Sequence, residues 1–249
     1  MKLEKTKQTI DKVNLYVMDG IRSYWTSLPD WPPFEDRAYY LNSNGALGTK
    51  ANSAKDSTKY IYDPNDPTPS HGGNNLEIDC GPLDQTDVDK HSGVITFETP
   101  VLDSDVVVCG HMYADLYVSS NCTDTDFMVK IEDVSAWDAA LVMDNALSMK
   151  WRKGMEVPYS PIEPNEIYNI MMDLWYTCKV FEAGHKIRVA ISSSNYPRFM
   201  ATGNNGLLAN ETGPVLIAEN TIHHGPEYPS RLILPIVDID ELPNNHHFL

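Results

Sequence analysis

Three consecutive serines at positions 192–194 are the first residues of this sequence that could supply a nucleophile. In α/β-hydrolases the catalytic serine lies in a Gly-x-Ser-x-Gly pentapeptide, because a strained strand-to-helix turn exposes its hydroxyl. The sequence contains no such pentapeptide, and Asn195, Tyr196 and Pro197 after the serines do not begin a helix. The pattern favours a polar strand end whose hydroxyls bond local backbone, so we assign no catalytic residue.

Histidines and acidic residues could act as metal ligands. The eight histidines form neither His-x-His nor His-Glu-x-x-His, and the neighbours His223 and His224 should point to opposite sides of an extended segment. Three Asp-x-Asp pairs place two carboxylates on one side of such a segment: Asp87 with Asp89, Asp103 with Asp105, and Asp124 with Asp126. Calcium favours oxygen clusters of this kind, although carboxylates that cap turns are the commoner use. We therefore assign no metal ligand and no cofactor, and calcium binding stays open.

Aromatic residues near the N-terminus could bind a sugar. Trp25, Trp31 and the pair Tyr39-Tyr40 would form a stacking platform if their rings shared one exposed surface. Packing in a core or an interface is the more common use of such residues. Burial of Trp25, Trp31 and Tyr39 would remove most of the support for sugar binding.

Alternation of apolar and polar residues predicts the elements that must position these groups. The predicted strands include residues 13–18, 112–118, 127–131, 147–151, 170–174 and 187–191. Clusters of Gly, Pro, Asn and Asp between the strands predict turns. Many strands and few helices favour an all-β sandwich over βαβ units.

The domain organisation follows from the same pattern. Residues 1–12 are predicted to be a linker or short helix, with the helical pattern over residues 3–12. Residues 13–240 are predicted to form one β-sandwich domain, and residues 241–249 a C-terminal tail. The polar segment 48–59 predicts a mobile loop.

Composition excludes several classes of partner. The 35 acidic residues outnumber the 19 basic ones, and the formal net charge is -16. This charge argues against nucleic acid and against an anionic membrane surface, both of which attract concentrated basic residues. The sequence has no apolar run long enough to span a membrane and no apolar stretch of a signal peptide near its start, so we expect a cytoplasmic protein. The four cysteines show no CxxC spacing and are expected to be reduced thiols.

A series of motifs in order along the chain resembles one family of serine hydrolases. The matching segments are residues 13–18, Trp25, Trp31-Pro32, 60–69, Gly72-Gly73, 81–85, 124–131, 181–188, 192–198 and 222–230. Together they resemble the C-terminal domain of the CocE/NonD hydrolases, the group of cocaine esterase and α-amino-acid ester hydrolase that is related to X-Pro dipeptidyl-peptidases. The resemblance covers about residues 13–238.

The resemblance implies a jelly-roll, galactose-binding-like β-sandwich that packs beside an α/β-hydrolase catalytic domain. In the family the Ser-Asp-His triad belongs to the upstream domains, so this chain is expected to be non-catalytic. The parent enzymes cleave esters or amides through an acyl-serine intermediate. A loop after the Gly-Gly pair helps to line the substrate pocket in cocaine-esterase-like members, and this implies a role here for Asn74, Asn75 and Leu76. Asn75 departs from the apolar residue expected at its position.

The other motif residues have structural interpretations. Asp124 and Asp126 are expected to cap or bridge the turn before the strand that begins at Phe127. Asn195, Pro197 and Arg198 are expected to turn the chain out of a core strand. The last two residues in this set are Asp84, a structural residue of the matching segment 81–85, and His185, which is expected to bond within the turn at Gly184.

Three functions compete at this point. The first is a non-catalytic accessory domain that supports a hydrolase domain and lines its pocket. The second is a free-standing carbohydrate-binding module, and the third is an autonomous enzyme with an unrecognised site. The accessory domain predicts an apolar docking face, and such a face left uncovered would favour a homodimer.

Overall fold

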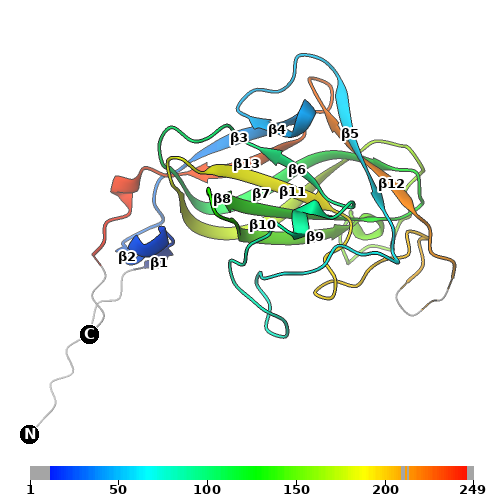
Figure 1. Ribbon diagram of the computed structural model, residues 1–249, viewed down its shortest axis with the longest axis horizontal. Coiled ribbons are helices and arrows are strands. Elements are labelled where there is room, and N and C mark those ends of the chain that lie inside the picture. The colour runs from blue at the N-terminus through cyan, green and yellow to red at the C-terminus, as the bar shows by residue number, and fades with distance from the viewer. Residues whose placement is uncertain (1–11, 209–210, 212, 246–249) are drawn as a thin grey trace, which may run out of the picture.

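A computed structural model describes residues 12–208, 211 and 213–245 as a β-rich domain (Figure 1). The predicted helix at residues 3–12 lies almost wholly outside these residues. The strands are β1 (Val13–Val17), β2 (Tyr24–Leu28), β3 (Glu35–Asn42), β4 (Ala46–Gly48), β5 (Asp56–Tyr62), β6 (Ile95–Glu98), β7 (Val106–Ser120), β8 (Asp126–Val134), β9 (Ala139–Ser148), β10 (Tyr168–Phe181), β11 (Lys186–Ser192), β12 (Ala218–His224) and β13 (Arg231–Ile236). The helical elements are short 3₁₀ turns: η1 (Gly20–Arg22), η2 (Ser43–Gly45), η3 (Val88–Lys90), η4 (Met149–Trp151) and η5 (Ile239–Glu241).

Among the described strands, β1 and β2 form a small hairpin and the other eleven form one sheet. Ten of the eleven follow the hydrogen-bonded order β5-β12-β7-β13-β3-β4-β6-β11-β8-β9, and β10 pairs with β7 outside this order. The pairings are antiparallel except that of β4 with β6. The sheet folds over on itself and encloses the apolar core, so the predicted all-β sandwich is confirmed (Figure 1).

Strand β8 shows how the core forms. Phe127, Val129 and Ile131 alternate along it, and their side chains are buried in the main hydrophobic cluster. The residues that alternate with them include Lys130 and Glu132, which sequence alternation assigns to the solvated face, yet both are buried. The outer face of β8 is therefore covered, because polar side chains of the segment that leads into η3 lie against it.

Two predicted segments differ from the structure. The predicted strand at residues 147–151 ends at Ser148, and η4 follows, because Met149 turns back to accept a hydrogen bond from the backbone N–H of Arg152. The predicted mobile loop at residues 48–59 is wrong at its end, because Asp56–Tyr62 pairs with β12 as strand β5. The polar side chains of that strand suit its exposed face.

A second, smaller hydrophobic cluster joins the β1-β2 hairpin to the sandwich. Val17 and Leu28 of the hairpin pack with Val107 of β7, Val180 of β10 and the buried Leu242.

The prediction of reduced cysteines is wrong for Cys109 and Cys178, which form a disulfide between directly paired positions of β7 and β10. Strand pairing brings them together across 69 residues, and sequence spacing gives no sign of it. Cys80 and Cys122 are free, as predicted.

The described helical elements are all single 3₁₀ turns, and none of them has the length and apolar character needed to cross a membrane.

Candidate pocket loop and its polar base

The Gly-Gly motif begins a loop, residues 72–81, that closes on itself. The backbone N–H groups of Gly73 and Gly81 each donate to the other residue's carbonyl, at 2.8 and 3.0 Å. Gly72 and Gly73 have φ values of +75° and +93°, in the region that disfavours side chains. A Cβ at Gly72 would also lie 2.6 Å from the carbonyl oxygen of Gly81. Only glycine fits these positions, so the motif fixes how the 72–81 loop leaves the sandwich.

The three residues expected to line a pocket differ in how they are oriented. Asn75 faces its own loop, because its Nδ2 donates to Gly72 O at 2.9 Å and its Oδ1 accepts from Ile78 N at 3.2 Å. Asn74 is exposed, and the side chain of Leu76 is fully exposed at 101%. The departure of Asn75 from the apolar pattern thus has a structural role in the turn, and Leu76 is the apolar group that the loop presents.

The segment after β11 lies beside the approach to this loop. Ser70 N donates to Tyr196 O at 2.6 Å, and Tyr196 N donates to Thr68 O at 3.0 Å. Arg198 N donates to Ser70 Oγ at 3.1 Å. As predicted, the chain turns out of the core strand here, through a cis peptide bond before Pro197. Both segments project from the same end of the sandwich (Figure 1).

One buried carboxylate on β9 holds these two segments together. Asp144 is 3% exposed, its Oδ2 accepts from Asn195 Nδ2 at 2.9 Å, and its Oδ1 accepts from Arg198 Nη1. A Cβ on Gly73 would meet both this guanidinium, at 2.9 Å, and Asp144 Oδ1, at 3.2 Å. The structure therefore brings Gly73, Asn195 and Arg198 together around Asp144, a residue that sequence reasoning did not identify.

The other end of the loop is held by Gln85 and Lys130. Gln85 Nε2 donates to His71 O at 2.7 Å and to Leu83 O at 2.9 Å, which links both ends of the loop. Its Oε1 accepts from the buried Lys130 Nζ of β8 at 2.8 Å. Burial lowers the pKa of Lys130. Asp84 Oδ1 accepts from Ala139 N at 2.9 Å, so it fastens the same segment to β9.

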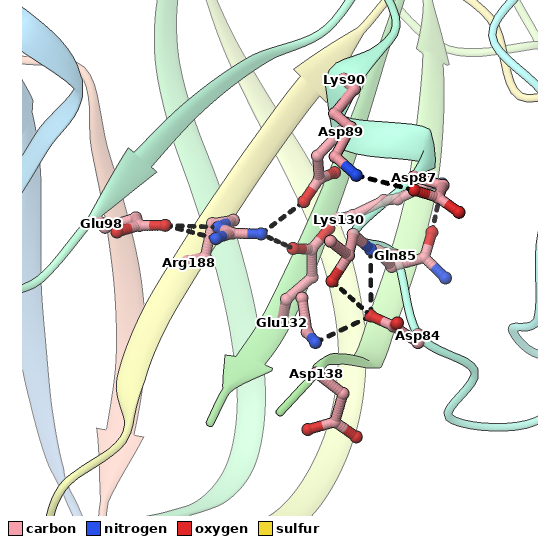
Figure 2. A network of polar contacts seen from close by, with 12 residues as sticks. Asp84, Gln85, Asp87, Asp89, Lys90, Glu98, Lys130, Glu132, Asp138 and Arg188 are labelled. Atoms are coloured by element: carbon pink, nitrogen blue, oxygen red, sulfur yellow. Dashed lines mark hydrogen bonds and ion pairs between the residues drawn. The ribbon is translucent and has the colours of Figure 1, made fainter. Parts of the chain in front are cut away.

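Beyond Gln85, η3 is fastened to the sheet by Arg188 of β11 (Figure 2). The guanidinium Nη1 donates to Asp89 Oδ2 at 2.5 Å and lies 3.4 Å from Glu132 Oε2. Its Nε and Nη2 donate to Glu98 Oε1, and Lys186 Nζ donates to Glu98 Oε2 at 2.8 Å. The base of the 72–81 loop is thus a partly buried ionic network.

The remaining motif residues lie in a separate buried group. Asp124 joins the turn before β8 to η4, because its Oδ2 pairs with Lys150 Nζ at 2.8 Å and its Oδ1 accepts from Lys150 N at 3.1 Å. Asp126 is the first residue of β8. Burial is the main cause that raises the pKa of Asp126 to about 6. Phe127, the next residue, is fully buried in the core.

His185 and the serine run complete the predicted residues. His185 bonds within the turn through its backbone N–H, which donates to Glu182 O at 3.0 Å, whereas its side-chain Nδ1 lies 2.8 Å from Asp133 Oδ1 of β8. Ser192–Ser194 are all buried. Ser192 Oγ donates to Ser194 O at 2.9 Å, as predicted, whereas the hydroxyl of Ser193 bonds Tyr60 and Asn220. Burial and hydrogen bonding leave no serine of this run open to a substrate.

The alternative sites receive little support. Tyr39 is buried in the core, so the three aromatic residues do not share an exposed platform. His223 and His224 bond different partners, Ser119 and Thr58, as expected for residues on opposite strand faces. Over residues 12–208, 211 and 213–245, no three His, Cys, Asp or Glu side chains are grouped to hold a metal ion.

Comparison with known proteins decides the family. Residues 6–233 of the chain match the protein family described as "X-Pro dipeptidyl-peptidase C-terminal non-catalytic domain". The chain belongs to this family. It is 38% identical over 245 residues to the cocaine esterase of Rhodococcus sp. (strain MB1 Bresler), an alignment that covers 92% of this chain and 42% of the esterase. The chain is therefore a non-catalytic C-terminal domain of the CocE/NonD type, and it spans less than half the length of this relative.

Solved structures show the same fold. An aminopeptidase from a marine sediment Thaumarchaeota archaeon superposes with a TM-score of 0.85 at 22% identity, over 94% of this chain and 42% of that one. An α-amino acid ester hydrolase superposes with a TM-score of 0.77 at 22% identity, over 86% of this chain and 39% of that one. In CocE/NonD enzymes this domain accompanies an N-terminal catalytic α/β-hydrolase domain.

Proposed function

We propose that this domain supports an α/β-hydrolase catalytic domain that cleaves carboxylic esters or amides, and that the 72–81 loop lines its substrate pocket. The observation that carries the proposal is Leu76, a fully exposed apolar side chain on a loop whose base is fixed by buried charges. An exposed leucine held by a rigid base suits a contact with another domain or a substrate. Asn74 is the polar neighbour of Leu76 at the same exposed tip.

Location and assembly are further parts of this proposal. The expected homodimer would cover apolar surface that otherwise meets the catalytic domain. The disulfide between Cys109 and Cys178 weighs against the expected cytoplasmic location, because disulfides persist mainly in oxidising compartments.

The test uses the purified chain together with the separately produced catalytic part of the Rhodococcus esterase. The chain alone should neither hydrolyse p-nitrophenyl acetate or butyrate nor react with a fluorophosphonate probe. Mixed with the catalytic part, it should bind and change the hydrolysis kinetics, and Leu76→Ala should alter KM for butyrate more than for acetate. Ile21→Ala is the matched control, because Ile21 is equally exposed but lies in η1.

Two results would contradict the proposal. Saturable turnover by the chain alone, with stoichiometric serine labelling, would show a nucleophile of its own. Equal effects of Leu76→Ala and Ile21→Ala on the mixed enzyme would remove the 72–81 loop from the pocket.

A further inference from the structure

Two carboxyl groups meet at the base of the 72–81 loop: Glu132 is fully buried, and the side chain of Asp89 is 9% exposed. Asp89 of η3 and Glu132 of β8 are hydrogen-bond neighbours, and each uses one oxygen to contact the same Nη1 of Arg188. Their second oxygens, Asp89 Oδ1 and Glu132 Oε1, are buried and have no donor. A buried acceptor without a donor costs free energy, and a single proton between the two groups would satisfy both.

The surrounding charges permit such a proton. Arg188 and Lys186 of β11 are mainly engaged by Glu98 of β6. Lys130, on the same face of β8 as Glu132, donates to Gln85, and Asp144 of β9 is paired with Arg198. Burial, followed by the nearby charge of Asp89, raises the pKa of Glu132 to about 9. Near neutral pH, Glu132 is therefore the protonated member of the pair.

We propose that Asp89 and Glu132 share one proton, and that the resulting carboxyl–carboxylate hydrogen bond positions the 72–81 loop by holding η3 against β8 (Figure 2). Glu132 is the donor and Asp89 Oδ1 the acceptor, while Arg188 compensates the negative charge that remains. Loss of the proton leaves two carboxylates face to face in a buried site, where like charges repel strongly.

The link from this pair to the loop runs through Gln85. Asp89 N donates to Gln85 O at 2.9 Å, and the Gln85 side chain bonds His71 O and Leu83 O on the two sides of the loop. A shift of η3 away from β8 would pull on Gln85 and weaken its bond with Lys130. Asp89 and Glu132 therefore act as positioning residues. The inference deepens the proposed function, since it concerns the same loop.

The chain supplies its own probe for this movement. Cys80 is exposed at the end of the loop, Cys122 is buried, and the other two cysteines form the disulfide. A maleimide fluorophore on Cys80 of the full chain reports loop mobility by its anisotropy. Between pH 7 and pH 10 the anisotropy of the unmodified sequence should fall with a midpoint near 9, because the shared proton is lost there.

Isosteric amides separate the shared proton from a general effect of alkali. In Glu132→Gln the amide donates permanently to Asp89, so the anisotropy should stay high across the range. Asp89→Asn should also abolish the transition, because its amide donates to Glu132. Asp126→Asn is the matched control, a buried acid on the same strand that lies outside the network, and it should keep the transition.

The result that overturns the inference is an alkaline transition that persists in Glu132→Gln or in Asp89→Asn, or one that is absent from the unmodified sequence. The measurement uses this chain alone and no substrate. A failure of the proposed pocket role would therefore leave it unaffected, and the two failures are distinguishable.

Discussion

The ion pair between Asp124 and Lys150 gives a sharp test of how buried charges stabilise this domain. Asp124 is 1% exposed, and the Nζ–Oδ2 distance is 2.8 Å. The backbone N–H of Lys150 also donates to Asp124 Oδ1 at 3.1 Å. The substitution Lys150→Met keeps the length of the side chain and the backbone bond but removes the positive charge.

The expected loss follows from the burial of the carboxylate that remains. Breaking a buried ion pair by removing one partner costs about 3–5 kcal/mol, because the other charge is left uncompensated. In a chain of this size, each kcal/mol lowers Tm by roughly 2–4 °C, so the substitution should lower Tm by roughly 6–20 °C. Lys150 Nζ also donates to Leu207 O at 2.9 Å, and the loss of that bond adds to the cost.

Urea unfolding at pH 7 measures the effect in a double-mutant cycle. Asp124→Asn in the Lys150→Met background removes the unpaired charge and keeps an acceptor for the backbone N–H. The double variant should therefore regain about 1–3 kcal/mol relative to Lys150→Met. Lys90→Met is the control, since the pair of Lys90 with Asp87 is exposed, and it should have no resolvable effect.

Two outcomes would refute this reasoning. A loss of less than about 1 kcal/mol in Lys150→Met would place the pair in the range of exposed salt bridges. A double variant no more stable than Lys150→Met would show that the buried charge is not the cause of the loss.

Further predictions concern the loop, one histidine and the disulfide. Gly72→Ala combines positive φ with a contact of 2.6 Å and should cost about 1–3 kcal/mol in urea unfolding; Gly154→Ala, with positive φ but no atom near its Cβ, should cost less. Burial lowers the pKa of His224 to about 4, so the unfolded chain binds a proton near pH 6.5 that the folded domain does not. Stability should therefore fall as pH drops from about 6.5 towards 4, and His224→Gln should reduce this fall; an unchanged slope would contradict the assignment. Thiol titration of the denatured, unreduced chain should count two reactive cysteines, because Cys109 and Cys178 are paired, and a count of four would contradict the disulfide.

The sequence predicts the parts of this fold that depend on local order. Alternation places Phe127, Val129 and Ile131 in the core, because successive side chains of a strand point to opposite faces, and a strand with one buried face therefore has an apolar residue at every second position. The Gly72-Gly73 pair predicts a turn, because only glycine adopts such φ values without strain. These signals need no knowledge of distant residues.

The rest of the candidate site depends on long-range packing. Lys130 and Glu132 stand at the positions of β8 that alternation assigns to solvent. Their face is covered because the segment that contains Gln85 and Asp89 packs against it, and the sequence pattern of β8 does not reveal this. The role of Asp144 likewise requires Arg198, 54 residues later in the chain, to lie beside β9. The signal that could have suggested both sites is a charged residue within a strongly apolar strand, although this signal does not identify the partner of the charge.

Buried charges on β8 and β9 also explain how a domain without catalytic residues can present a loop in a defined position. Apolar residues of similar size at Lys130 and Glu132 would stabilise a sandwich as well as an ion pair does, or better. They would not choose between positions of the covering segment, because apolar contact has no direction. Hydrogen bonds from Lys130 to Gln85 and from Arg198 to Asp144 do have direction, and they hold both sides of the 72–81 loop. The ionic network is therefore better understood as a device that fixes loop geometry than as a source of net stability, and loop anisotropy and urea unfolding of the Glu132→Gln variant measure these two roles separately.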